Sequence, residues 1–370
     1  MCGIVGYLGD RQAQKTLLSG LRRLEYRGYD SAGIVTLGKS AEATLLRAKG
    51  KVAELDKLAT KSATNDTVGI GHTRWATHGA PSEHNAHPHH VGEIYLVHNG
   101  IIENYKDLKE VLSGRGYEFK SETDTEVLAA LIDETYQEQD AKDLHAAVID
   151  SLKAVVGAYG IAVMSVKNPD EIVVARKGSP LVLGVGEDEV YIASDPSALV
   201  GHTDQVIYLK DDEVAVCRRD GVELTDANAT PLSPTIEKLE LDVQSIQKKG
   251  YDHFLLKEIM EQPTTLRATL SGRVIPEEHR AQLGGLNLTD DQLREIEHVV
   301  IIGCGTAYYA GLQASYYLER IVEGLTVEVQ VASEFRYRSF SLPKNSVALV
   351  VSQSGETADT LACLREIKRR

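Results

Sequence analysis

Hydrophobic and polar positions alternate along the first part of the chain with two different periods. Apolar residues over 2–8, 34–36 and 68–72 predict strands, and leucines at helical intervals over 11–23 predict an amphipathic helix. Both patterns recur, with helices predicted over 126–139 and 144–155 and short strands over 161–166, 172–175, 182–185, 190–193 and 213–217. These elements predict stacked, largely antiparallel sheets with helices on their outer faces.

A stretch rich in Pro, Asn, Thr and Ser then interrupts both periods. Residues 226–245 therefore predict a linker between one domain over residues 1–225 and a second over residues 246–370. At the start of the second domain, the pattern predicts a helix over 254–260 that ends before Gln262–Pro263.

Two units of strand, turn and helix follow near the end of the chain. Continuous apolar strands of this kind are typical of a buried parallel sheet, in which a ligand lies beyond the carboxyl ends of the strands. The first unit runs from a strand over 298–302 through Gly303–Thr306 into a helix over 307–323, and the second runs from 347–351 through Ser352–Thr357 into 358–368.

Composition limits the possible functions. A length of 370 residues indicates two or three domains, and 42% hydrophobic with 25% charged residues is typical of a soluble globular protein. A net charge of −14 argues against nucleic acid as a partner, and we find neither a membrane-spanning run nor an export signal. The cysteines, Cys2, Cys217, Cys304 and Cys363, form no CxxC pair or disulfide framework, so we expect a reduced, cytoplasmic location, with Cys217 in the core.

The first residues place a thiol where the mature N-terminus would be if the initiator methionine were removed. Cys2 would then carry its own general base, because an α-amino group with a pKa of roughly 7.7 to 8.0 is partly uncharged at neutral pH. Gly3 and Gly6 flank an apolar step that would pin this end of the chain in a sheet. The alternative is that Cys2 is only a small residue after the start codon, and its position alone does not decide between the two.

A long stretch from Thr73 to His90 has little periodicity yet contains the only Trp of the chain. Arg74 within it is suited to a substrate carboxylate, because a guanidinium group can bind two oxygens at once. Seven of the 12 histidines fall between residues 72 and 98. Residues 87–90 lack the helical spacing of zinc-binding histidine pairs and have no cysteine nearby, so we expect no metal.

Asn99, Gly100 and Asp124 each admit two interpretations. Asn-Gly after an apolar run is a strong hairpin-turn signal, but an Asn amide and a Gly backbone N–H exposed at a strand end could also donate to a developing oxyanion. Asp124, just before a helical run, is either an N-cap or a carboxylate that receives a substrate ammonium group. The residue types alone leave both alternatives open.

The turn from Ser352 to Thr357 has the chemistry of a phosphate cradle. The hydroxyls of Ser352, Ser354 and Thr357 and the amide of Gln353 surround a helix N-terminus, whose backbone N–H groups and dipole attract an anion. The alternative is a hydroxyl-rich N-cap without a ligand.

These motifs, in this order, resemble known enzyme families. The first half resembles the glutaminase domain of class II glutamine amidotransferases, which are N-terminal-nucleophile hydrolases, at Cys2–Gly6, His72–Gly79, His98–Gly100 and Thr123–Asp124. The second half resembles the sugar isomerase (SIS) fold at Gly303–Thr306 and Ser352–Thr357. The two halves in this order are similar to the glutamine–fructose-6-phosphate aminotransferase family over essentially the whole chain.

The resemblance implies a fold and a reaction. The fold is α/β, with the αββα sandwich of N-terminal-nucleophile hydrolases followed by a partial SIS domain, a flavodoxin-like parallel αβα sandwich. The reaction releases ammonia from L-glutamine and passes it to fructose 6-phosphate, giving glucosamine 6-phosphate and glutamate in the first step of hexosamine biosynthesis. The resemblance implies no cofactor, and a homodimer when full length.

The resemblance also implies roles for individual residues. Cys2 would form a glutamyl thioester, and Asn99 and Gly100 would make the oxyanion hole. The other implied contacts are Arg74 to the glutamine α-carboxylate, Asp124 to its α-amino group, Thr77, His78 and His87 in the pocket wall, Trp75 as the ammonia gate, and Ser352, Gln353, Ser354 and Thr357 to the sugar phosphate, with Gly305 and Thr306 nearby.

Two differences from the family pattern change the activity and the sugar contacts that we expect of this chain. Members usually carry two SIS lobes, whereas this sequence ends at Arg370 within the first, without the second lobe, the carboxyl-terminal tail or the lysine that forms a Schiff base with the sugar. We therefore expect residues 1–370 to hydrolyse glutamine but not to complete sugar amination. Ala307 stands where many relatives place a serine, so that sugar contact is not carried over.

Two alternative functions are compatible with part of these motifs. Another class II amidotransferase, of the amidophosphoribosyltransferase or asparagine synthetase type, would share the Cys2 end. The turn from Ser352 to Thr357 counts against both types, because their acceptor domains bind pyrophosphate or ATP. The other alternative is a non-catalytic SIS sugar-phosphate sensor, which would have no reactive Cys2.

Overall fold

The computed structural model of the protein describes residues 2–25, 28–38, 42–75, 80–139, 142–239, 251–270, 274–275, 280–281, 288–353, 355 and 357–370. The chain forms two compact units, residues 1–252 and residues 253–370. Within the described residues, no helix is both long enough and apolar enough to cross a membrane.

Two antiparallel sheets form the centre of the first unit. The eight-stranded sheet has the order β15-β11-β9-β10-β1-β4-β2-β3, and the seven-stranded sheet has the order β14-β13-β12-β8-β7-β6-β5. The strands of the first are β1 (Gly3–Leu8), β2 (Ser31–Leu37), β3 (Ala43–Lys49), β4 (Val68–Arg74), β9 (Val182–Val185), β10 (Val190–Ala193), β11 (Gln205–Tyr208) and β15 (Glu237–Lys238). Those of the second are β5 (His89–Val91), β6 (Ile94–Ile102), β7 (Gly157–Ser165), β8 (Asn168–Lys177), β12 (Glu213–Arg218), β13 (Gly221–Asp226) and β14 (Pro231–Leu232).

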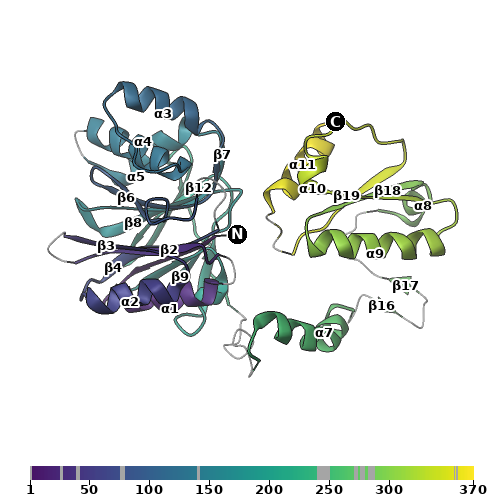
Figure 1. Cartoon of the computed structure of the whole chain (residues 1–370), viewed down its shortest axis with the longest axis horizontal. Coiled ribbons are helices and arrows are strands. Elements are labelled where there is room, and N and C mark those ends of the chain that lie inside the picture. Colours follow the sequence, from purple (N-terminus) through teal and green to yellow (C-terminus); the bar gives the residue numbers. More distant parts are fainter. Residues whose placement is uncertain are drawn as a thin grey trace. The chain divides into compact units, whose positions relative to one another are not determined.

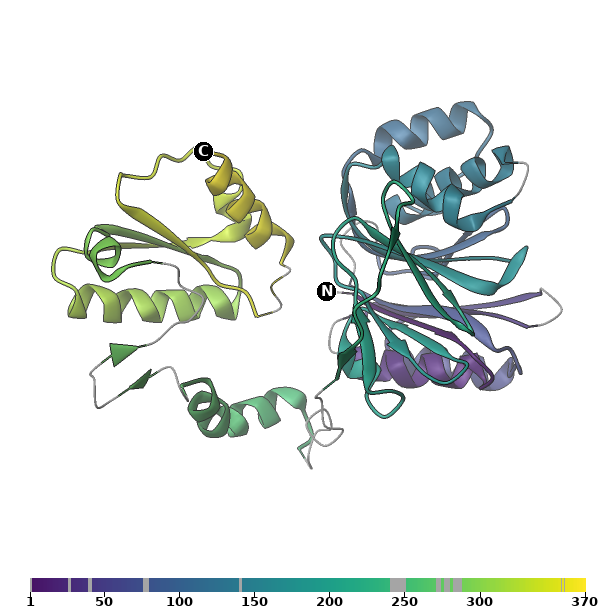
Figure 2. The ribbon, with the colours of Figure 1, turned by 180° about the vertical axis from the view of Figure 1, so that it is seen from behind.

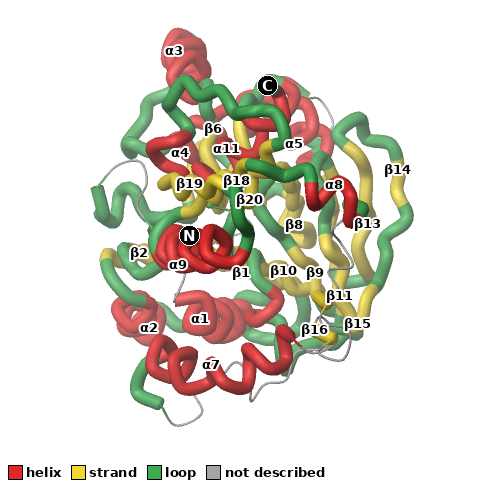
Figure 3. Tube along the Cα trace, turned by 90° about the vertical axis from the view of Figure 1, so that its right-hand side faces the viewer, coloured by secondary structure: helices red, strands yellow, loops and turns green. Residues whose placement is uncertain are grey.

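Helices cover the outer face of each sheet. α1 (Ala13–Leu24) and α2 (Val52–Lys61) pack on the eight-stranded sheet, and α4 (Asp124–Glu138) and α5 (Leu144–Lys153) pack on the seven-stranded sheet, with α3 (Tyr105–Gly114) against α4 (Figures 1 and 3). The first unit is therefore an αββα sandwich, and the predicted fold class is confirmed for it.

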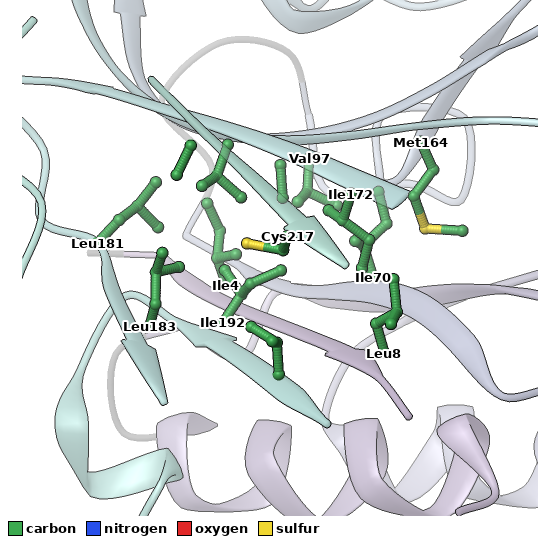
Figure 4. Close-up of a cluster of buried hydrophobic side chains, with 14 of the residues drawn as sticks. Ile4, Leu8, Ile70, Val97, Met164, Ile172, Leu181, Leu183, Ile192 and Cys217 are labelled. Carbon is green, nitrogen blue, oxygen red and sulfur yellow. The ribbon is translucent and has the colours of Figure 1, made fainter. Parts of the chain in front are cut away.

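The space between the two sheets is filled by apolar side chains from both inner faces. Ile4 of β1, Ile70 of β4, Val97 of β6 and Met164 of β7 meet there and are almost fully buried (Figure 4). Cys217 of β12 belongs to the same cluster, which confirms its predicted place in the core. Because strand side chains alternate between faces, this inner core fixes which residues of β1, β4 and β6 point away from it.

Part of the predicted linker belongs to the sheets. β14 pairs with β13, and β15 pairs with β11, although both strands lie within residues 226–245. Each has only two residues with exposed side chains, so neither leaves a hydrophobic period in the sequence. The exact limits of the domains and the linker stay a prediction.

The second unit contains a parallel sheet of three strands in the order β19-β18-β20. These are β18 (His298–Gly303), β19 (Thr326–Val331) and β20 (Ser346–Val350). α9 (Thr306–Ile321) covers one face, and α10 (Ala332–Phe335) and α11 (Ala358–Arg369) cover the other (Figures 1 and 2). This arrangement confirms the predicted parallel αβα sandwich. The unit also includes α7 (Phe254–Leu270), α8 (Asp290–Arg294), β16 (Val274–Ile275) and β17 (Arg280–Ala281).

The predicted end of the first helix of this unit is wrong. α7 continues through Pro263 to Leu270. A proline inside a helix removes one intrahelical hydrogen bond, but it ends the helix only when the remaining bonds are too weak. Here the single hydroxyl hydrogen of Thr265 is shared between the carbonyl oxygens of Glu261 and Gln262, both at 3.2 Å, and so adds a hydrogen bond at the proline.

Candidate active site

The first strand brings Cys2 to the end of a neighbouring strand. β1 pairs with β4 so that Gly3 lies opposite Thr73, and this register brings Cys2 opposite Arg74 and next to Trp75. The backbone N–H of Trp75 donates to Cys2 Sγ at 3.2 Å, and Sγ lies 3.6 Å from the Trp75 carbonyl oxygen. The backbone that follows β4 thus fixes the position of the thiol.

The environment of this thiol keeps it protonated at rest. Although Cys2 as a residue is only partly buried, desolvation of its sulfur raises the pKa of the thiol, and the Trp75 N–H and the charge of Arg74 only partly oppose this shift. Nucleophilic attack requires the thiolate, so the site needs a base. The predicted base is the α-amino group of Cys2, which is free only after removal of Met1, a residue outside the described part of the chain.

Asn99 and Gly100 lie within a strand and not at a turn. β6 pairs with β7 beyond both residues, with Asn99 opposite Gly160 and Gly100 opposite Tyr159. The hairpin interpretation is therefore wrong, and so is the expectation that both residues lie exposed at a strand end. Gly100 has a φ of 141°, and a Cβ atom there would lie 2.0 Å from the carbonyl oxygen of Ala158, so only glycine fits this part of the strand.

The side chain of Asn99 points to the thiol residue. Its Nδ2 donates to the carbonyl oxygen of Cys2 at 3.3 Å, and its Oδ1 lies 2.9 Å from Nε2 of His72. An amide nitrogen carries two hydrogens, so one N–H remains beyond the bond to Cys2. This arrangement leaves a donor next to the thiol, as an oxyanion hole requires.

Arg74 and Asp124 supply opposite charges near the same thiol. Arg74 is the last residue of β4 and is 4% exposed. Burial lowers the pKa of its guanidinium group, and the nearby Asp124 carboxylate is one of the groups that oppose that shift. The two side chains therefore interact electrostatically, as expected of a pair that could bind the two charged ends of an amino acid.

Asp124 is held in place by its own neighbours. Its Oδ2 accepts the backbone N–H of Ile102 at 2.8 Å, and its Oδ1 faces the hydroxyl of Thr125 at 3.5 Å. The N-cap of α4 is Thr123, whose hydroxyl accepts the backbone N–H of Glu126 at 3.3 Å, so the N-cap interpretation of Asp124 is wrong. The predicted N-cap is one residue too late, because Thr and Asp are both good N-cap residues and stand next to each other here.

Four buried histidines, His72, His87, His89 and His98, form a cluster that contacts Asn99 through His72. The rings of His72 and His87 stack at 4.2 Å, and those of His87 and His89 meet edge to face at 4.9 Å. The backbone N–H of His98 donates to Nδ1 of His87 at 3.4 Å. Burial lowers the pKa of all four, to about 3 for His72 and His89, so each ring is neutral at pH 7.

Sequence reasoning placed only His87 in this region. The concentration of histidines between residues 72 and 98 was the available signal, but it does not show that strands from different sheets bring them together. Within the described residues, no group of three or more His, Cys, Asp or Glu side chains is arranged to hold a metal ion. The histidines bind one another and neighbouring polar groups.

Trp75 lies at the surface beside Tyr29. Its ring is 44% exposed and contacts the Tyr29 ring edge to face, with centroids 5.4 Å apart. The N–H of Asp30 donates to the carbonyl oxygen of Arg74 at 3.0 Å, so the loop before β2 packs along the residues next to the thiol. Two predicted pocket residues, Thr77 and His78, lie outside the described residues.

The second unit brings together the two predicted turns. β18 and β20 are neighbouring parallel strands, and the N–H of Val351 donates to the carbonyl oxygen of Ile302 at 2.8 Å, so Gly305–Thr306 and Ser352–Thr357 follow the same edge of the sheet. The Ser352 hydroxyl lies 3.1 Å from that of Thr357 and accepts the N–H of Gly355 at 3.1 Å.

Thr357 precedes α11 without capping it through its side chain. The N–H groups of this first turn are thus not satisfied by the threonine hydroxyl, which is compatible with the predicted phosphate cradle. Gln353 is exposed at the same turn, and Ser354 lies outside the described residues.

Comparison with known proteins identifies the family of the first unit. The sequence matches the glutamine amidotransferase domain family over residues 42–251, which is more than half of the chain. The chain belongs to this family. Residues 292–370 of the same chain match the SIS domain family.

Similar proteins match this chain over its whole length. The glutamine--fructose-6-phosphate aminotransferase [isomerizing] of Chlorobaculum tepidum is 49% identical over 375 residues, a match that covers 100% of this chain and 61% of that protein. The enzyme of the same name from Thermus thermophilus is 49% identical over 372 residues and is covered to 60%. The chain thus spans about three fifths of the length of these relatives.

Solved structures show the same fold. The structure described as glutamine phosphoribosylpyrophosphate amidotransferase from B. subtilis complexed with ADP and GMP has a TM-score of 0.55 at 22% identity, and the match covers 100% of this chain and 71% of that one. At this identity the likeness concerns the fold alone.

Proposed function

We propose that this glutamine amidotransferase uses Cys2 to release ammonia from L-glutamine, as the first half of a glutamine–fructose-6-phosphate aminotransferase. The observation that carries the proposal is the position of the Cys2 residue between two donors. The Trp75 N–H contacts its sulfur at 3.2 Å and the Asn99 amide contacts its carbonyl oxygen at 3.3 Å. A nucleophile with a hydrogen-bond donor beside it is the minimum that acyl transfer requires.

The reaction follows from these groups. After removal of Met1, the α-amino group of Cys2 takes the thiol proton, and the sulfur attacks the side-chain amide carbon of glutamine. The remaining N–H of Asn99 and the Gly100 backbone donate to the oxyanion that forms. Collapse of this intermediate breaks the C–N bond, the nitrogen leaves as ammonia with the proton from the amine, and water then cleaves the thioester to give glutamate.

Arg74 and Asp124 account for recognition of the amino acid. A guanidinium group binds a carboxylate through two parallel hydrogen bonds, and a fixed carboxylate binds an ammonium group. Asp124 is fixed by Ile102 and Thr125, and both charged side chains are almost fully buried, at 4% and 6% exposure. His87, Thr77 and His78 complete the proposed pocket wall, and Trp75 is proposed to gate the ammonia.

The second unit is proposed to take part in binding the ammonia acceptor, fructose 6-phosphate, through Ser352, Gln353, Ser354 and Thr357, with Gly305 and Thr306 nearby. The SIS match over residues 292–370 supports this acceptor and counts against one carrying pyrophosphate or ATP. In the full-length enzyme the products would be glucosamine 6-phosphate and glutamate. We propose that residues 1–370 support the glutaminase half.

We also propose a cytoplasmic location and a homodimer for the full-length enzyme. The four cysteines are free thiols, as expected for a reducing compartment.

Labelling with 6-diazo-5-oxo-L-norleucine tests the proposed nucleophile. This glutamine analogue alkylates an active-site nucleophile, so mass spectrometry should find the label on Cys2 of a chain that lacks Met1. The Cys304→Ala variant, altered in the other unit, should label equally. A non-catalytic sugar-phosphate sensor would show no label at Cys2, and that result would overturn the proposal.

A further inference from the structure

The Asn99 amide, on the seven-stranded sheet, is held from two sides by groups that belong to the eight-stranded sheet side of the first unit. Its Nδ2 lies 3.3 Å from the carbonyl oxygen of Cys2 on the eight-stranded sheet side, and its Oδ1 lies 2.9 Å from Nε2 of His72 in β4. Asn99 itself belongs to β6 of the other sheet. The contact with His72 therefore joins the two sheets next to the thiol.

Hydrogen-bond chemistry requires a hydrogen on one particular nitrogen of His72 in this contact. The Cys2 carbonyl oxygen can only accept, so the Asn99 atom facing it must be the NH2 group. The Asn99 oxygen then faces His72 and can only accept, so His72 must carry its hydrogen on Nε2. If the Asn99 amide rotated by 180°, its oxygen would face the Cys2 oxygen and its NH2 group would face the Nε2–H of His72. Neither contact would then be a hydrogen bond.

Neighbouring residues hold the His72 ring in this position. The ring stacks on His87 at 4.2 Å with an interplanar angle of 26°, and His87 in turn accepts the backbone N–H of His98 at 3.4 Å. His72 is 0% exposed, and burial lowers its pKa to about 3, so the ring stays neutral over the range in which enzymes usually work. A neutral, fixed ring offers a single donor in a single direction.

We propose that His72 is a positioning residue for glutamine hydrolysis, whose Nε2–H holds the Asn99 amide with its NH2 group toward the nucleophile. This inference rests on the proposed function, in which Asn99 donates to the oxyanion. His72 also stacks on His87 of the proposed pocket wall, so a role through that wall would appear in KM, whereas a role through Asn99 appears in kcat. It is expected to matter in the transition state, where the oxyanion forms, and little in glutamine binding.

A pair of amide substitutions tests the proposal. His72→Gln places an N–H donor close to the position of Nε2, whereas the shorter His72→Asn remains polar but cannot reach Asn99. We expect His72→Asn to lower kcat for glutamine hydrolysis by about 10- to 100-fold, with KM changed by less than about threefold, because removing an oxyanion donor outright costs 10²–10³-fold. His72→Gln should recover most of the loss. Equal kcat values in the two variants, or a loss that appears mainly in KM, would overturn the proposal.

His89 provides a matched control from the same group of histidines. It is buried, stacks edge to face on His87, and bonds to Thr123 and not to Asn99. We expect His89→Asn to lower the Tm at least as much as His72→Asn while keeping kcat within about threefold of the parent. If His89→Asn lost as much kcat as His72→Asn, the effect would be general loosening of the fold, and the proposal would be wrong.

Alkylation separates this inference from the proposed function. Iodoacetamide reacts with the thiol without forming an oxyanion, so the rate at Cys2, followed by peptide mass spectrometry, should be the same in His72→Asn and in the parent. A slower rate in the variant would show damage to the nucleophile and would refute a role through Asn99. A parent protein without glutaminase activity would instead refute the proposed function.

Discussion

The backbone N–H of Trp75 donates to the sulfur of Cys2 at 3.2 Å, which connects the proposed ammonia gate directly to the proposed nucleophile. The contact exists because β1 and β4 are antiparallel neighbours with Gly3 opposite Thr73. The indole ring of Trp75 points to a different environment, where it is 44% exposed beside Tyr29. The same residue can therefore orient the thiol through its backbone while its side chain remains free to take another rotamer.

Replacement of Cys2 by alanine should abolish release of ammonia. Loss of a covalent nucleophile lowers kcat by more than about 10³-fold, and the product to measure is glutamate from L-glutamine. Cys217→Ala is the control, because this cysteine is 0% exposed in the core between the sheets and should cost stability without affecting chemistry. Sugar-phosphate binding by an intact SIS domain should not change in Cys2→Ala. Residual activity near that of the parent would exclude Cys2 as nucleophile.

Neutralising Asp124 should weaken glutamine binding. Asp124→Asn keeps an oxygen that can accept the Ile102 N–H but loses the charge that would bind the α-ammonium group. A hydrogen bond to a charged group is worth about 1.5–3 kcal/mol, so we expect KM to rise about 10- to 100-fold with a smaller change in kcat.

Asp133→Asn is the matched control for that substitution. Asp133 lies in the same helix, is 4% exposed and accepts the backbone N–H of Glu93 at 3.0 Å, but it belongs to no proposed contact with substrate. Steady-state kinetics should give the control a KM within about threefold of the parent. An equal rise in KM for both variants would assign the effect to α4 as a whole.

Regular elements and the glycine-rich turns could be predicted from the sequence, because their signals are local. The helix α1 and the strand β1 both appear as short-range patterns. The exposed two-residue strands β14 and β15 could not be predicted, since pairing of backbone groups at a sheet edge leaves no hydrophobic period.

Sequence reasoning named candidate site residues, whose roles stay predictions, but it did not find the contacts that hold them in place. Cys2, Arg74 and Asp124 could be predicted as candidates from the chemistry of their side chains. In the structure, the charge of Arg74 lies close enough to Cys2 and to Asp124 to interact with both. The contact of His72 with Asn99 joins two sheets across 27 positions in sequence, and no local pattern encodes such a contact. The hairpin turn predicted at Asn99–Gly100 is wrong for a related reason. The left-handed φ of Gly100 is required because the backbone of the neighbouring strand lies close to it, and not because the chain turns there.

Alanine at position 100 should destabilise the first unit strongly. Gly100 has a φ of 141°, and an added Cβ would lie 2.0 Å from the Ala158 carbonyl oxygen, so β6 or β7 would have to shift. We expect a loss of roughly 2–4 kcal/mol in the free energy of unfolding. Urea unfolding followed by the fluorescence of Trp75, the only Trp of the chain, reports on this unit.

Gly114 is the control for Gly100. It is the last residue of α3, and an added Cβ would meet no atom within 4 Å. Gly114→Ala should leave stability unchanged or raise it by up to about 1 kcal/mol, since alanine is the better helix former. Similar unfolding curves for the two variants would show that Gly100 carries no backbone constraint.

The buried histidines should make the first unit sensitive to acid. The folded pKa of His72 and of His89 is about 3, whereas the unfolded value is about 6.5, so between these values the unfolded chain binds more protons than the folded one. The free energy of unfolding should therefore fall as the pH drops below about 6.5, by up to about 1.4 kcal/mol per pH unit for each such histidine. His89→Gln removes one of these groups and should flatten the dependence by that amount, while His84→Gln, at an exposed position, should leave it unchanged. Urea unfolding at several pH values from about 7 down to 5 measures the slope of the free energy of unfolding against pH. If His89→Gln and the parent gave the same slope, His89 would bind its proton as readily in the folded protein as in the unfolded chain.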